Sequence, residues 1–132
     1  CAEFCGLQHA FMAYDVVALP PDRYAAWAQH QRAAPPEPQD ADARRGRELF
    51  LTGSCMLCHA VQGTSAQGRR GPDLTHFAGR AHIGAGSIEN TPKALARWIE
   101  DPQKLKPGAN MPSHFLPAAD LAALVAYLET LS

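Results

Sequence analysis

The chain of 132 residues has no run of about eighteen or more apolar residues, the length that a membrane-spanning helix requires. It shows no signal peptide and does not begin with methionine. It also has no long run of like charge, and with a formal net charge of −1 it does not indicate nucleic acid as a partner. Sulfur is scarce, with four cysteines and three methionines, and these few residues carry most of the functional information.

One pair of cysteines lies in Cys55-Met56-Leu57-Cys58-His59, and Cys-x-x-Cys-His is the attachment signature of a covalent c-type haem. Cys55 and Cys58 would add to the haem vinyl groups, and His59 would bind iron from the proximal side. A zinc site would need a second ligand pair, and a redox dithiol would need a βαβ context that the sequence does not show. The stretch therefore predicts one covalent haem.

A second iron ligand is expected downstream, in the loop-forming residues 106–112 (KPGANMP). Their prolines and glycine favour a fixed, non-helical path. Met111 in this loop would complete His/Met ligation, which raises the iron potential and suits electron transfer. The alternative is a methionine that only fills a gap in the packing. His76, His82 and His114 are rival ligands.

Helix signals surround these two motifs. Asp40 or Asp42 can cap a helix over residues 43–50, with Gly53 as its stop. Two more helices are expected, one from Thr91-Pro92 to Pro102 and one after Pro117 with an apolar stripe at 121, 124, 125, 128 and 131. The pattern predicts a small helical domain whose core the porphyrin helps to fill.

Over about residues 42–132 the chain resembles the single-haem cytochrome c family. The resemblance implies a mainly α fold, with helices packed around the covalent haem. Gly46 and Phe50 on the first helix and Tyr127 on the last match the positions where that family crosses its terminal helices.

Two further matches concern the surroundings of the haem. Residues 71–74 (GPDL) look like a loop of the same family in which the carbonyl of Pro72 accepts the N–H of the proximal His59. Such a bond would orient the ring and tune its basicity. By the same resemblance Trp98 would face a haem propionate. The alternative is that Trp98 is only a core residue of an amphipathic helix.

The other two cysteines lie in the first twelve residues. Cys1, Cys5, His9 and Met12 form a soft donor set, which suits copper better than zinc. These ligands can hold metal only if the loop folds back over a rigid frame, and the β-prone residues 13–19 are expected to supply one. The alternative is an oxidised Cys1–Cys5 disulfide, which would leave the histidine and the methionine unexplained.

This segment resembles the binuclear copper A site of cytochrome c oxidase subunit II, whose pattern C-x-E-x-C-x-x-x-H-x-x-M is matched at every ligand position. The resemblance implies that Cys1 and Cys5 bridge two copper ions and that His9 and Met12 are terminal ligands. Glu3 would supply its backbone carbonyl, and its side chain would reach a magnesium ion at the interface with the catalytic subunit.

A short helix from Pro20-Pro21-Asp22 and a Pro/Ala-rich linker over residues 33–41 separate the two motifs. We therefore expect residues 1–32 to be the C-terminal piece of a copper A cupredoxin domain, a β remnant of a truncated barrel, and residues 42–132 to be a cytochrome c domain. The family places another copper-binding histidine and its membrane anchors upstream of the first cysteine. The chain is thus expected to be the C-terminal portion of a longer protein, with an incomplete copper site.

The order of copper motif, linker and haem domain resembles bacterial oxidases in which subunit II carries a fused cytochrome c. The resemblance implies an electron-transfer subunit of a proton-pumping terminal oxidase at the outer, periplasmic face of a bacterial inner membrane. It would have no catalytic residue of its own, and electrons would pass from a cytochrome c or cytochrome bc complex through haem c to copper A and on to catalytic subunit I. The alternatives are a nitrous oxide reductase with a fused cytochrome, which Glu3 disfavours because tryptophan is usual there, and a free-standing cytochrome c carrier.

Overall fold

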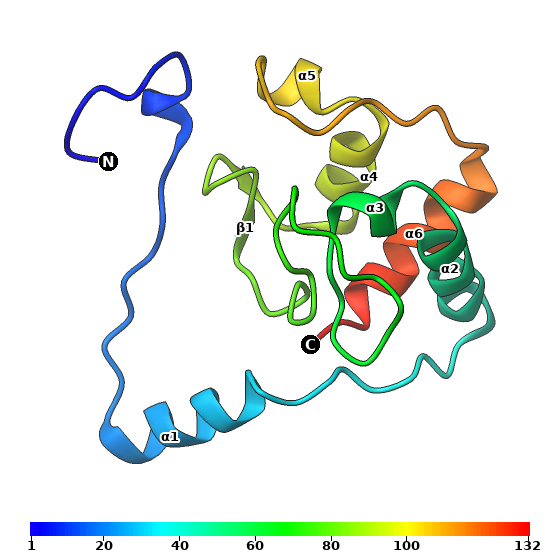
Figure 1. Cartoon of the computed structure of the whole chain (residues 1–132), viewed down its shortest axis with the longest axis horizontal. Coiled ribbons are helices and arrows are strands. Elements are labelled where there is room, and N and C mark those ends of the chain that lie inside the picture. Colours follow the sequence, from blue (N-terminus) through cyan, green and yellow to red (C-terminus); the bar gives the residue numbers. More distant parts are fainter.

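The computed structural model describes residues 1–132, and its elements are mainly helices with one small sheet (Figure 1). In chain order the helices are η1 (His9–Phe11), α1 (Pro21–His30), α2 (Ala41–Thr52), α3 (Cys55–Cys58), α4 (Pro92–Glu100), α5 (Pro102–Leu105) and α6 (Ala118–Glu129). Strand β1 (His82–Ile83) pairs antiparallel with β2 (Ile88–Glu89). None of the helices combines the length and the apolar character needed to cross a bilayer. The expected mainly α fold is confirmed.

Helices α2 and α6 cross where their backbones approach most closely. A Cβ atom on Gly46 would overlap the carbonyl oxygen of Ala123 and would lie 2.8 Å from the Cβ of Tyr127, so the close approach requires a glycine. Beside it, the rings of Phe50 and Tyr127 meet at a centroid distance of 5.7 Å and an angle of 59°. The expected crossing of the first and last helices of this region is confirmed.

The ends of α2 and α4 follow from local capping chemistry. The carboxylate of Asp40 accepts hydrogen bonds from the backbone N–H groups of Ala43 at 3.2 Å and Asp42 at 2.8 Å. These bonds lower the pKa of Asp40, because they stabilise its ionised form. The hydroxyl of Thr91 caps α4 in the same way by accepting from the N–H of Ala94 at 3.2 Å. Of the two candidate caps for α2, Asp40 is therefore the one used.

The hydrophobic core lies between α2, α4, α6 and the loops that follow α3. Helix α6 is buried along most of its length because it packs against both α2 and α4. Core side chains from these segments include Phe50, Val61, Leu74, Phe77, Leu95, Leu124 and Tyr127. Cys55, Trp98 and Met111 are partly buried against the same core.

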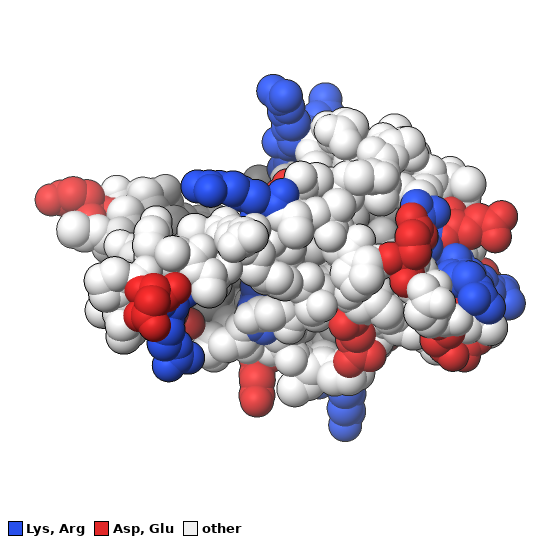
Figure 2. Space-filling view, turned by 90° about the horizontal axis from the view of Figure 1, so that it is seen from below, with Lys and Arg blue, Asp and Glu red and all other residues white.

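On the face in Figure 2, charged side chains are scattered over a largely uncharged surface, with basic ones gathered along the upper edge and both signs mixed elsewhere. Two of the surface pairs connect α2 to other segments of the chain. Arg45 of α2 pairs with Asp120 of α6, and Arg47 contacts Glu37 at 3.0 Å. Exposed pairs of this kind contribute little to stability, so burial in the core dominates.

Residues 13–19 form no strand, and the predicted β remnant is wrong at this point. A β-strand needs a neighbouring strand to accept and donate its backbone hydrogen bonds. Within this segment only the N–H of Ala13 has a backbone partner, the carbonyl of Ala85 at 2.7 Å. The remainder runs as an exposed, extended arm that leads to α1 (Figure 1).

Helix α1 begins at Pro21, as the proline pair predicted, and none of its residues is buried. Residues 33–39 after it contain no helix or strand. They return the chain to α2. The end of α1 and the residues just after it contact the helical part at two points. The side-chain amide of Gln62 donates to the carbonyl of Arg32 at 3.1 Å, and the ring of His30 lies 4.8 Å from that of His76.

Candidate functional site

The Cys-x-x-Cys-His stretch forms one helical turn, α3, followed by an extended residue. Cys55 and Cys58 stand at the two ends of that turn, so they share one side of it. The backbone N–H of His59 donates to the carbonyl of Cys55 at 3.0 Å, which closes the turn. Both thiols are free, and burial raises the pKa of the Cys55 thiol. Two thiols on one side of a fixed turn form a suitable attachment site for a ligand with two reactive arms.

The ring of His59 is held by the loop that the sequence indicated. With Nδ1 protonated, the imidazole donates to the carbonyl oxygen of Pro72 at 2.8 Å. Gly71 packs flat against the ring, because a Cβ there would lie 2.5 Å from Cε1 and 2.7 Å from Nδ1 of His59. This leaves Nε2 as the ring nitrogen available to a metal. The free thiols and the oriented imidazole together fit a covalent haem c.

Met111 lies in a loop that is fixed by its own side-chain contacts. The amide of Gln103 donates to the carbonyl of Ala109 at 2.6 Å and accepts from the N–H of Gly108 at 2.9 Å. Further along, the hydroxyl of Ser113 donates to the carboxylate of Asp101 at 3.0 Å. Met111 itself is partly buried against the core. The loop therefore presents its thioether from a defined position, as a ligand or as packing.

The rival histidines have other surroundings. His82 lies 3.6 Å from the carboxylate of Asp15, and His76 packs against the ring of His30. His114 uses its backbone N–H to bond the end of α4. Trp98 covers the β1–β2 turn, where a Cβ on Gly84 would lie 3.2 Å from its ring. The side chains of His76, His82 and Trp98 thus have packing or pairing contacts of their own.

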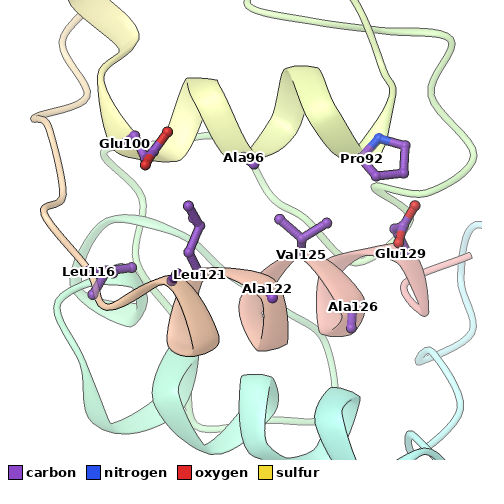
Figure 3. A pocket seen from close by; sticks show the side chains of 10 residues that line it. Pro92, Ala96, Glu100, Leu116, Leu121, Ala122, Val125, Ala126 and Glu129 are labelled. Carbon is purple, nitrogen blue, oxygen red and sulfur yellow. The ribbon is translucent and has the colours of Figure 1, made fainter.

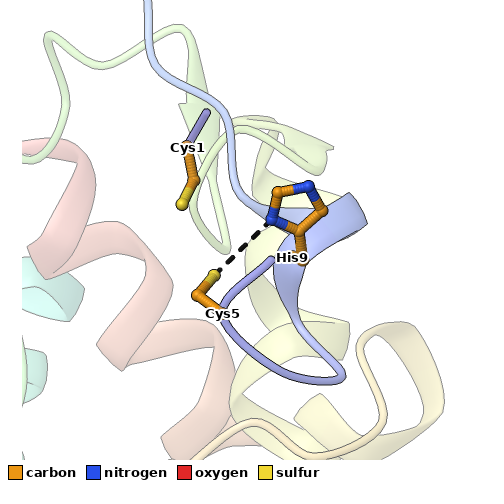
Figure 4. A group of neighbouring side chains, drawn as sticks. All are labelled: Cys1, Cys5 and His9. Atoms are coloured by element: carbon orange, nitrogen blue, oxygen red, sulfur yellow. Dashed lines mark hydrogen bonds between the residues drawn. The ribbon is translucent and has the colours of Figure 1, made fainter. Parts of the chain in front are cut away.

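The first twelve residues gather sulfur, nitrogen and oxygen donors (Figure 4). One donor atom from each of Cys1, Cys5 and His9 lies within 4.8 Å of the others. The Sγ of Cys5 is 3.7 Å from Nδ1 of His9 and 3.3 Å from Sδ of Met12. The Sγ of Cys1 lies 2.9 Å from the carbonyl oxygen of Glu3. All five predicted donors therefore meet in one exposed loop.

This donor set passes a chemical test for copper. Thiolates, a thioether and an imidazole are soft to borderline ligands, which favour copper over harder cations. Cys1 and Cys5 are free and exposed, and both sulfurs are available to bridge metal ions. A backbone carbonyl in the same cluster adds one oxygen. The loop as folded fits a thiolate-bridged copper centre.

Lys106, for which the sequence indicated no role, joins this loop to the helical part. Its Nζ donates to the carbonyl oxygens of Phe11 at 2.6 Å and Gly84 at 2.8 Å. The residue is only 8% exposed, and burial lowers the pKa of its ammonium group. A lysine directly before Pro107-Gly108 was visible in the sequence, but nothing local indicated its partners.

An open groove of about 360 Å³ lies between α4 and α6 (Figure 3). Its lining is mostly apolar, with Glu100 and Glu129 as the acidic residues. It contains no cysteine, histidine or methionine and therefore offers none of the soft ligands that the two candidate metal sites use. The groove lies apart from the chemistry described above.

Known proteins align with this chain over the helical part alone and over nearly its whole length. Residues 43–132 match the family model of cytochrome c. The chain is 43% identical over 132 residues to cytochrome c oxidase subunit 2 of Alkalihalophilus pseudofirmus, and 38% identical over 137 residues to that of Bacillus sp. strain PS3. Each of these alignments covers 99% of this chain and 38% of the relative. Cytochrome c2 of Rhodopila globiformis is 37% identical over 114 residues, 75% of this chain and 98% of that protein.

Proposed function

Because residues 43–132 make this chain a member of the cytochrome c family, we propose that it transfers electrons from a covalent haem c to a binuclear copper A centre within subunit 2 of a cytochrome c oxidase. The observation that carries this proposal is the second cluster, where five predicted donors meet in a segment that the oxidase subunits align with and that lies outside the cytochrome c match. When bound, the haem and the copper centre would each accept and release one electron at a time.

In this proposal the chain's residues hold the haem in one orientation. Cys55 and Cys58 attach it through thioether bonds on one side of α3, which keeps it in place in both oxidation states. His59 offers Nε2 while its Nδ1–H stays bonded to the carbonyl of Pro72 at 2.8 Å. That bond fixes the ring and raises its basicity as a ligand. Met111 would offer a thioether from the loop of residues 106–112, and Trp98 would contribute to the haem surroundings.

At the other centre, Cys1 and Cys5 would hold the two copper ions through their thiolates. His9 and Met12 would each serve one copper as a terminal ligand, and the carbonyl of Glu3 would complete the set. The close spacing of Cys5 to both His9 and Met12 supports this assignment. Copper bound there would supply the one-electron chemistry that passes electrons on. The Glu3 side chain is free to contact a magnesium ion at the interface with subunit I.

The proposed electron path starts at a cytochrome c or cytochrome bc complex and ends at catalytic subunit I. This chain would contribute no catalytic residue to the oxidoreductase. Its proposed division is a copper A piece over residues 1–32, a linker over residues 33–41 and a cytochrome c domain over residues 42–132. Covalent haem attachment and copper loading favour the outer face of a bacterial inner membrane.

The test removes one bridging thiolate in the assembled oxidase. Cys5→Ser should leave the haem reducible by a cytochrome donor but stop its reoxidation through copper, because one thiolate cannot keep two copper ions paired. Ala10→Ser is the matched control, since it adds the same hydroxyl to an exposed position of the loop without removing a ligand. Stopped-flow spectroscopy follows the haem. Normal reoxidation in Cys5→Ser would contradict the proposal.

A free-standing electron carrier is the second candidate. It is favoured by the match to cytochrome c2, since the aligned region covers 98% of that protein. In such a carrier the Cys1–Met12 cluster would have no redox role, and Cys5→Ser would leave every electron-transfer rate of the haem unchanged.

A further inference from the structure

The loop of candidate copper ligands rests on the helical part of the chain at two places. One is the β1–β2 turn, residues 84–87, and the other is residues 106–108 of the methionine loop. We call these two segments together the docking surface. Residues 8–13 of the ligand loop contact both segments, although their sequence separation reaches 99 positions.

Lys106 is the central contact of the docking surface. Its ammonium group donates at 2.6 Å to the carbonyl of Phe11 and at 2.8 Å to that of Gly84, so it joins the ligand loop to the turn. Neither acceptor is an acid, and Lys106 takes part in no ion pair. A largely buried charge without an acidic partner is costly unless its hydrogen bonds are made. The bond to Phe11 is lost if the ligand loop moves away from Lys106, and the bond to Gly84 is lost if the turn does.

The backbone of the ligand loop adds further bonds to the turn. The N–H of Ala13 donates to the carbonyl of Ala85 at 2.7 Å, and the hydroxyl of Ser87 donates to the carbonyl of Phe11 at 3.0 Å. Gly86, at φ +79°, lets the turn and the ligand loop approach each other closely, because a Cβ at this position would lie 2.8 Å from the Cβ of Ala13. The fit therefore involves shape as well as hydrogen bonds.

The second docking segment repeats this arrangement. The side-chain amide of Gln8 donates to the carbonyl of Pro107, and a Cβ on Gly108 would lie 2.9 Å from the same amide nitrogen. Gln8 precedes one candidate copper ligand, His9, and residues 106–108 precede Met111 in its loop. The contacts thus connect the backbone beside one metal centre to the backbone beside the other.

We propose that Lys106 is a positioning residue that docks the copper-ligand loop onto the haem domain and thereby fixes the route for electrons between the two centres. The electron-transfer part of this statement rests on the proposed function, whereas the docking part does not. Phe11 is adjacent to Met12, so the Lys106 bond acts on the backbone one residue away from a ligand. Lys104 is a natural contrast, because it is exposed and bonds only its neighbour Asp101 at 3.3 Å.

The first experiment measures docking without copper, in the haem-loaded chain. Lys106→Met keeps the aliphatic stem and removes the ammonium group, and Lys104→Met is the matched control. Amide exchange followed by NMR should show the N–H of Ala13 exchanging at least about tenfold faster in Lys106→Met, the factor expected from losing even one hydrogen bond to a charged group. Lys104→Met should exchange like the parent. Equal exchange in the two variants would overturn the docking role.

The second experiment measures electron transfer in the assembled oxidase. Lys106→Met should slow the passage of electrons from haem to copper while leaving the rate of haem reduction by a donor and the haem spectrum unchanged. Faster amide exchange with unchanged internal electron transfer would overturn the positioning role. If the parent shows no copper centre at all, the proposed function fails, but the exchange result still decides the docking.

A second variant covers the case in which Lys106→Met does not fold. Ser87→Ala removes a hydroxyl that donates to the same carbonyl of Phe11 from an exposed position of the turn. It should accelerate exchange at Ala13 in the same direction by a smaller factor, because one neutral hydrogen bond is lost in place of two charged ones. Equal exchange rates of the Ala13 N–H in Ser87→Ala and in the parent would count against the docking surface.

Discussion

Replacing Gly71 by alanine tests whether the loop after α3 sets the orientation of the proximal imidazole. The added Cβ would lie 2.5 Å from Cε1 and 2.7 Å from Nδ1 of His59, and ordinary contact begins at 3.4 Å. The ring or the loop must therefore move by about 0.9 Å at Cε1, and the hydrogen bond to Pro72 at 2.8 Å cannot be kept without adjustment. Forced overpacking of this kind costs about 1–3 kcal/mol.

We expect Gly71→Ala to lower the free energy of unfolding of the haem-loaded chain by about 1–3 kcal/mol in guanidinium titrations. Hyperfine-shifted NMR signals of His59 in the oxidised protein should move as well, because the ring turns relative to its metal. Gly79→Ala is the matched control. Its Cβ would meet only the carbonyl oxygen of His76 at 3.8 Å, so stability and spectrum should stay near those of the parent. If the two variants behave alike, Gly71 does not position the imidazole.

Two more predictions concern the second iron ligand and the helix cap. Met111→Ala should abolish the thioether-to-iron charge-transfer band at the red end of the oxidised spectrum and lower the potential, and an unchanged band would assign the ligand elsewhere. Asp40→Ala should lower the stability of the chain against unfolding at neutral pH, and the loss should be smaller in acid. The pKa of Asp40 is lowered by the N–H groups it accepts from, so its contribution is present above its unfolded pKa and is lost as pH falls through the folded value. Thermal unfolding at several pH values measures this, with Asp42→Ala as the control, and a pH-independent difference would exclude the cap.

Local rules were sufficient for most of the helical part. Asp40, Thr91 and the prolines at positions 21 and 117 mark helix starts, because capping and proline geometry act within one turn. The crossing of α2 and α6 was also visible, since Gly46 and Tyr127 carried a family pattern. The prediction failed at residues 13–19. Their β propensity is real, but a strand depends on a partner that propensity does not supply.

The sequence by itself indicated the two candidate ligand clusters, because each set of donors lies within a few residues: Cys55, Cys58 and His59 in one, and residues 1–12 in the other. Tertiary structure alone decided how the cluster in the first twelve residues is supported. The bond from Lys106 to Phe11 spans 95 positions, and that from Gln8 to Pro107 spans 99. Contacts of such separation depend on how the whole chain packs, and no local pattern of charge or hydrophobicity encodes them.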